Sequence, residues 1–216
     1  MKNHTTINTI PSSEHDIRIA GHTDIEKVCS ILASAFTNDP VVNWLCGQPK
    51  VYRSLFYFEA EALYRHHGHV YINNEFTGAA MWLPAGVHAK PPFHWRSMIV
   101  FWQLTSNGGL KSLRRVGLLE KFMAERHPHE PHFYLRFIGT SLENQGRGIG
   151  SKLLKAGLSA CDQQGMPAYL ESSNENNNLL YERHGFAIIG EEDLPDGGPT
   201  IWFMHRNASD LKGKLC

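Results

Sequence analysis

The N-terminal part of the chain passes from a polar stretch into regular patterns of apolar positions. Residues 16–20 alternate polar and apolar side chains, which is typical of a half-buried strand. Apolar residues then recur with helical spacing from Ile25 to Phe36, and Thr23 stands where it can cap the start of that helix. The tripeptide that begins at Asn38 contains a proline and predicts the end of the helix.

Helical and strand-like patterns alternate through the middle of the chain. The expected elements are a long aromatic-rich helix at 51–67 stopped by Gly68, strands at 69–72 and 78–83 joined by a turn at 73–77, and a breaker-rich loop at 84–92. Residues 93–125 predict one or two helical segments divided near Asn107. We expect this stretch to be an insertion that covers a substrate pocket.

The C-terminal half has the clearest periodicity. The expected elements are a strand at 132–140, a helix at 148–164, a strand at 168–172, a short helix at 176–184, and strands at 187–191 and 200–205. The predicted organisation is one domain at 16–207, made of an acceptor-side half at 16–130 with the insertion at 93–125 and a second half at 131–207, between disordered tails at 1–15 and 208–216.

Composition narrows the range of functions. The 216 residues are 42% apolar, and 21 basic residues balance 21 acidic ones, so nothing favours nucleic acid or an anionic membrane as the main partner. No apolar run is long enough to span a membrane, and no secretory signal is recognised, so we expect a cytoplasmic protein with reduced thiols.

The histidines and cysteines do not suggest a metal site. None of the 13 histidines stands in an HExxH or His-x-His pattern of ligands, and the four cysteines are far apart. The pairs His66 with His67 and His127 with His129 are interpreted as surface residues. Cys161 lies on the apolar stripe of its helix and is interpreted as a core residue.

A glycine-rich turn between a strand and a helix carries the most informative chemistry. Gln145 and the glycines at 146, 148 and 150 surround the expected helix start. Glycine permits close backbone approach, and the first N–H groups of a helix lack internal partners and favour negative charge. The run therefore predicts an anion site suited to a pyrophosphate, to which Arg147 and Lys152 are expected to add positive charge.

Two other phosphate-binding motifs are alternatives for this turn. The glycines also resemble a dinucleotide-binding fingerprint, with Glu171 as its acidic residue about 20 positions on. That alternative requires an early strand–helix–strand unit, whereas this turn follows a late strand. A Walker loop is excluded because its GxxxxGK[ST] pattern does not occur.

Two motifs together carry a family resemblance. The run that starts at Gln145 resembles the Q-x-x-G-x-G acetyl-CoA signature of the GNAT acetyltransferase superfamily, and the run from Asn174 to Phe186 resembles its downstream N-x-x-x-x-x-x-Y-E-x-x-G-F segment. Residues 130–206 are also similar to puromycin N-acetyltransferase-like proteins, which are linked to antibiotic resistance. The resemblance implies an α/β fold with a mixed, mostly antiparallel sheet of about six or seven strands, flanked by helices and splayed between strands 4 and 5.

The resemblance also assigns roles to residues. It implies acetyl-CoA as co-substrate, no metal, and a bulge at Gly139, with cofactor contacts from Ile138, Gly139, Thr140, Gln145, Gly146, Arg147, Gly148, Ile149, Gly150, Ser151, Asn174, Asn177 and Tyr181. Tyr181 takes the general-acid position. Glu171 is either the general base or a structural carboxylate paired with a neighbour such as Arg136.

The acceptor is less defined by the sequence. Several aromatic residues are either core residues or the lining of an acceptor pocket: Trp44, Tyr52, Phe56, Tyr57, Phe93 and Trp95. The expected function is transfer of acetyl to a small-molecule primary amine by a monomer or homodimer. The alternatives are a protein or peptide N-acetyltransferase and a non-catalytic acyl-CoA-binding module.

Overall fold

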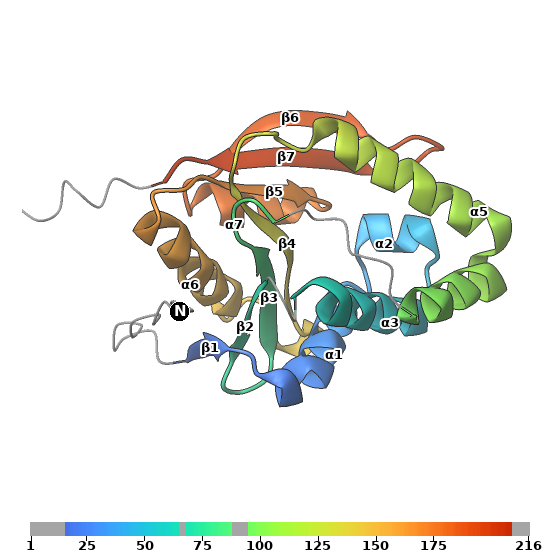
Figure 1. Cartoon of the computed structure of the whole chain (residues 1–216), viewed down its shortest axis with the longest axis horizontal. Helices are drawn as coiled ribbons and strands as arrows, with labels where there is room; N and C mark the ends of the chain where they lie inside the picture. The colour runs from blue at the N-terminus through green and yellow to red at the C-terminus, as the bar shows by residue number, and fades with distance from the viewer. Residues whose placement is uncertain (1–15, 65–67, 88–94, 209–216) are drawn as a thin grey trace, which may run out of the picture.

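The computed structural model describes residues 16–64, 68–87 and 95–208. Its centre is a seven-stranded sheet with the order β1-β2-β3-β4-β5-β7-β6 (Figure 1). The strands are β1 (Ile17–Ile19), β2 (His69–Asn73), β3 (Gly78–Leu83), β4 (Phe133–Thr140), β5 (Ala168–Ser172), β6 (Ala187–Asp193) and β7 (Thr200–Arg206). These strands lie close to the ranges that the sequence predicts.

The sheet is divided at its middle. Every neighbouring pair is antiparallel except β4 and β5, which run parallel and pair only from Phe133 to Leu135. Beyond Leu135, β4 continues along β3 to Thr140, while β5 stays with β7. The two strands therefore part towards their carboxyl ends, which confirms the predicted fold class and splay. A sheet with one parallel pair also excludes the dinucleotide-binding alternative, which needs successive parallel strands.

Helices cover both faces of the sheet (Figure 1). They are α1 (Ile25–Ala35), α2 (Pro40–Leu45), α3 (Pro49–Glu59), α5 (Arg96–Arg126), α6 (Ile149–Gln163) and α7 (Asn178–Glu182). The apolar stripes of α1 and α3 pack on one face with Leu32, Phe56 and Tyr169, and α6 packs on the other with Leu153 and Leu170. Two cores result, one on each face.

The start of the chain differs in detail from the prediction. Thr23 does not cap α1, because it lies inside a 3-10 turn, His22–Asp24, in which the Asp24 side chain accepts from the Gly21 N–H at 2.9 Å. The helix α2 was not predicted. Asp39 caps it by accepting from the Val42 N–H at 2.9 Å, and Pro40 occupies its first position. The tripeptide that begins at Asn38 therefore both follows the end of α1 and starts α2.

The aromatic-rich helix changes geometry before its end. It runs as α3 to Glu59 and continues as a π-helical turn, Ala60–Tyr64. A π turn adds a residue to the turn and is stable only where packing compensates for the altered hydrogen bonds. The predicted end at 65–67 lies outside the described residues.

The predicted two-part insertion is one long helix with a kink. Gly109 has φ 62° and ψ −157° inside α5, close to the predicted division at Asn107. Ion pairs join the second segment to β6 and to the turn that follows it: Arg126 pairs with Glu192 at 2.6 Å, and Arg115 pairs with Asp196 at 3.2 Å. The helix thus reaches from α3 across to β6 (Figure 1).

The bulge in β4 was predicted at the wrong residue. The register steps from Leu135 to Phe137 opposite consecutive residues of β3, so the extra residue is Arg136, not Gly139. A Cβ added at Gly139 would lie 2.5 Å from the Cβ of Ala35. This glycine therefore allows α1 to approach the strand closely.

The tails and the division of the chain into two halves were also predicted. The tail predicted at 1–15, and 209–216 of the tail predicted at 208–216, lie outside the described residues. The division into two halves remains a prediction. No helix in the described part of the chain has the length and apolarity needed to cross a membrane.

Candidate active site

The glycine turn forms an open cradle at the start of α6. Gly146 and Gly148 have φ values of 75° and 78°, and a Cβ on either would meet nothing within 4 Å. Gly148 is the N-cap of α6 and supplies no side-chain cap, so the N–H groups of Ile149 to Ser151 have no capping side chain. Open space before uncapped N–H groups is what a pyrophosphate needs.

The polar side chains around the cradle are only partly as predicted. Gln145 donates to the Thr140 carbonyl at 3.4 Å, and Arg147 is exposed. Lys152 does not add charge to the cradle, because it pairs with Asp16 at 2.5 Å. Ser151 lies 2.8 Å from Nε2 of His184, which links the helix start to the end of α7.

The edge of β4 beside the cradle is the predicted place for the pantetheine arm. Ile138, Gly139 and Thr140 are half-buried and lie beyond the last residue pair with β5. Asn174 is the N-cap of a short 3-10 turn and accepts from the Asn176 N–H at 3.1 Å, whereas Asn177 is exposed. Neighbouring Asn178, which was not predicted, is buried and its side-chain oxygen has no partner.

Tyr181 lies in α7 and is buried against Phe186 with ring centroids 6.2 Å apart. Burial, together with the nearby charge of Asp39, raises the pKa of the Tyr181 hydroxyl. The phenol is therefore protonated at neutral pH, as a general acid must be.

Asp39 is a site residue that the sequence analysis missed. Besides capping α2, its carboxylate accepts a hydrogen bond from the Ser173 hydroxyl just beyond β5. Burial raises its pKa. The loop between α1 and α2 is thereby fastened to the mouth of the splay, close to Tyr181. The Asn-Asp-Pro pattern predicted only the end of a helix, and nothing local predicted the partner 134 residues away.

Glu171 lies on β5 with only 5% of its side chain exposed. One carboxylate oxygen accepts from the Tyr134 hydroxyl, and the other lies 3.5 Å from Nδ1 of His127. Arg136 is not its partner, because that guanidinium pairs with Glu59 at 2.7 Å. The predicted alternative of an Arg136–Glu171 pair is therefore wrong.

Buried polar groups surround this carboxylate. Burial, and then the charge of Glu171, raises the pKa of the Tyr134 hydroxyl, and the same two causes raise that of Tyr169. The Tyr169 hydroxyl lies near Glu171 but makes no hydrogen bond. The Tyr64 hydroxyl also has no hydrogen-bond partner. Unpaired buried polar groups are rare because each costs about 1–3 kcal/mol.

The two histidines next to Glu171 were not predicted as site residues. His127 follows α5 directly and is 28% exposed. Its ring lies 3.1 Å, Nε2 to Nε2, from His132, which precedes β4. His127 is only partly exposed and also contacts Glu171 and His132, whereas His129 is exposed as expected.

The aromatic candidates are mainly structural. Trp44, Tyr52 and Phe56 are buried in the core beside α1 and α3. Trp95 is 58% exposed, and Phe93 lies outside the described residues. The core interpretation therefore holds for three of these residues.

Cys161 is buried in the core, as expected, and burial raises the pKa of its thiol to about 12. Within residues 16–64, 68–87 and 95–208, no group of three or more potential ligands could hold a metal ion.

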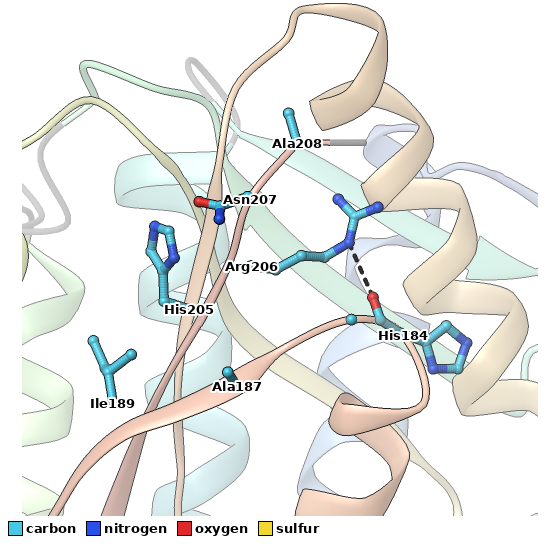
Figure 2. Close-up of a pocket in the computed structure, with 8 residues that line it drawn as sticks. His184, Ala187, Ile189, His205, Arg206, Asn207 and Ala208 are labelled. Atoms are coloured by element: carbon cyan, nitrogen blue, oxygen red, sulfur yellow. Dashed lines mark hydrogen bonds between the residues drawn. The ribbon is translucent and has the colours of Figure 1, made fainter. Parts of the chain in front are cut away.

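A surface hollow of about 540 Å³ lies elsewhere, between the start of β6 and the end of β7 (Figure 2). Arg206 in this hollow already donates to the His184 carbonyl at 2.9 Å and pairs with Asp162. Because Arg206 pairs in register with Ala168 at the beginning of β5, the hollow lies at the opposite end of that strand from the splay. It is not part of the candidate active site.

Comparisons with known proteins agree with this geometry. Residues 114–188 match the model of the acetyltransferase (GNAT) domain. The chain is 29% identical over 185 residues to an uncharacterized N-acetyltransferase of Schizosaccharomyces pombe, a match that covers 76% of this chain and 71% of that protein. Residues 114–188 are therefore similar to the GNAT acetyltransferase domain, and the two matches together support an acyltransferase.

Solved structures show the same fold. One is a histone acetyltransferase HPA2 and related acetyltransferase from Corynebacterium glutamicum, with a TM-score of 0.63, 24% identity, and coverage of 89% of this chain and 96% of that one. Another is arylalkylamine N-acetyltransferase 2 from Aedes aegypti, with a TM-score of 0.57, 12% identity, and coverage of 89% and 98%. The closer resemblance to puromycin N-acetyltransferase-like proteins stays a prediction.

Proposed function

We propose that the chain transfers the acetyl group of acetyl-CoA to the primary amine of a small molecule by direct attack in a ternary complex. Three features of the structure carry this proposal together. The cradle at the start of α6 is open, and the edge of β4 that faces β5 has no partner strand beyond Leu135. Two groups that can exchange protons, Tyr181 and Glu171, lie near the same splay. Acetyl-CoA is accordingly the co-substrate.

The reaction needs one base and one acid. The neutral amine attacks the thioester carbonyl, a C–N bond forms and the C–S bond breaks. Glu171 takes the proton that the amine loses, directly or through a water molecule, and Tyr181 gives its proton to the departing thiolate. Each positioned proton transfer is typically worth about 10²–10⁴-fold in rate.

The cover over the acceptor side supports a small acceptor. Glu171 shares its face of the sheet with Tyr169, and the residue that follows α5, His127, contacts it. The same helix is fixed at Asp196 and Glu192 by ion pairs. An extended peptide would require an open groove, so the protein or peptide N-acetyltransferase alternative is less favoured.

A thiol-release assay with acetyl-CoA tests the proposal. The panel contains puromycin, an aminoglycoside, a polyamine, free amino acids and a peptide. We expect turnover of a small amine in preference to the peptide. Turnover of the peptide alone supports the protein-directed alternative, and calorimetric binding of acetyl-CoA with no turnover contradicts the proposed reaction. A cytoplasmic location and a monomeric or homodimeric state remain predictions from the sequence.

A further inference from the structure

His127, His132 and Glu171 form a continuous chain of polar contacts that leads from the splay to the surface. We infer that this chain is a proton relay in which Glu171 passes the amine proton to His127, and His132 fixes the tautomer of His127 that can receive it. The inference rests on the proposed function of Glu171 as the base.

The tautomers follow from the partners. Nδ1 of His132 lies 2.7 Å from the Glu130 carbonyl, which only accepts, so this nitrogen carries a proton. Burial lowers the pKa of His132, so its ring is neutral and Nε2 has a free lone pair. His127 must therefore donate from its own Nε2 across the 3.1 Å contact.

This arrangement leaves one proton position open. Nδ1 of His127 faces a carboxylate oxygen of Glu171 at 3.5 Å, and the other oxygen already accepts from Tyr134. Two lone pairs facing each other repel, so the His127–Glu171 contact is favourable when a proton lies between them. A proton that reaches Glu171 consequently has a ready acceptor in Nδ1.

The steps balance as a simple proton transfer. The amine N–H bond breaks as an O–H bond forms at Glu171, and that O–H bond breaks as an N–H bond forms at Nδ1 of His127. The imidazolium then releases a proton to water, which its 28% exposed side chain can contact, whereas Glu171 is 5% exposed. His127 and His132 act through Glu171 and are positioning residues.

Other titratable and charged groups surround the relay. From β4 and β5 come Tyr134, Tyr169 and Arg136, from α3 and the π turn Glu59 and Tyr64, and from β7 His205. Arg136 is neutralised by Glu59, and the pKa values of all three tyrosines are raised by burial. Arg136 and the three tyrosines therefore keep a fixed charge near neutral pH.

Nuclear magnetic resonance of ¹⁵N-labelled histidine tests the relay without knowledge of the acceptor. We expect His132 as the Nδ1–H tautomer at neutral pH. We also expect Glu171→Gln to change the ring nitrogen signals of His127 but not those of His129, which is exposed and two residues away. An Nε2–H tautomer at His132, or a His127 spectrum that ignores Glu171→Gln, would overturn the relay.

Kinetics supply the second test, with the most active amine of the panel. We expect His127→Ala to lower kcat about tenfold or more, to change the shape of the pH–rate profile, and to recover part of the rate when imidazole is added. His129→Ala is the matched control and should behave as the wild type. Wild-type rates in His127→Ala overturn the relay. A loss of rate also overturns it if added imidazole restores no activity and the pH–rate profile is unchanged. If the wild type turns over no amine, the proposed function is contradicted. The tautomer measurement does not depend on turnover, so the two failures can be told apart.

Discussion

The cradle at the start of α6 and the buried cluster around Glu171 lie on the two sides of the splay, and they are built in different ways. The cradle consists of backbone groups from one short run, Gln145 to Ser151, and its side chains are largely exposed. The cluster consists of side chains from separate elements, such as His127 and Glu171, which are 44 residues apart. Under the proposed function, the co-substrate site is thus built from local sequence, whereas the acceptor side depends on the whole fold.

The largest expected effect concerns the acid next to the cradle. Tyr181→Phe should lower kcat by about 10²–10⁴-fold, because it removes a positioned proton donor while keeping the ring. CoA affinity and thermal stability should stay close to wild type. Tyr71→Phe is the control, since Tyr71 is buried in the same apolar cluster without a place at the splay. Equal turnover in wild type and Tyr181→Phe would remove the proposed acid.

The next effect breaks the buried cluster. Arg136→Met leaves Glu59 as an uncompensated buried charge and should lower the free energy of unfolding by about 3–5 kcal/mol. Adding Glu59→Leu should restore much of that loss, because no buried charge remains. Truncation of Arg126 in its exposed pair with Glu192 should cost only about 1 kcal/mol or less. Urea denaturation of the three variants and the wild type measures these losses. Similar losses for both arginines would show that the Arg136–Glu59 pair is not desolvated.

A smaller effect separates a packing glycine from a binding glycine. Gly139→Ala should lower the free energy of unfolding by about 1–3 kcal/mol, because the new Cβ would lie 2.5 Å from the Cβ of Ala35. The folded protein should still bind CoA with near wild-type affinity. An unchanged stability together with a strong loss of CoA affinity would instead place Gly139 in the binding site, as the resemblance implied.

The sequence predicted the local half of this picture well. The sequence predicted all seven strands close to their observed ranges, and it predicted the turn from its glycines before a helical stripe, because each of these features depends on near neighbours. The sequence did not predict the Arg136–Glu59 pair, the Tyr134–Glu171 contact or the Asp39–Ser173 contact. These side chains meet only after β4, β5 and the helices above them have packed, and spacing along the chain contains no trace of that register.

The bulge shows the same limit in one position. The family resemblance implies a bulge at Gly139, and a glycine is compatible with irregular backbone. The extra residue is Arg136, held by an ion pair to a helix 77 residues earlier in the chain. The Arg136–Glu59 contact at this position is long-range, and no local pattern records it.

The central claim is that the glycine turn binds the pyrophosphate of CoA, and one titration tests it directly. Gly148→Asp and Gly148→Asn place side chains of nearly the same shape at a φ of 78°, which both residue types tolerate, and they differ by one negative charge. Calorimetric titration of CoA into the two variants should show affinity about tenfold or more weaker for Gly148→Asp, with the gap narrowing at high salt. Equal affinities for the aspartate and asparagine variants at low salt would contradict an anion site at this turn.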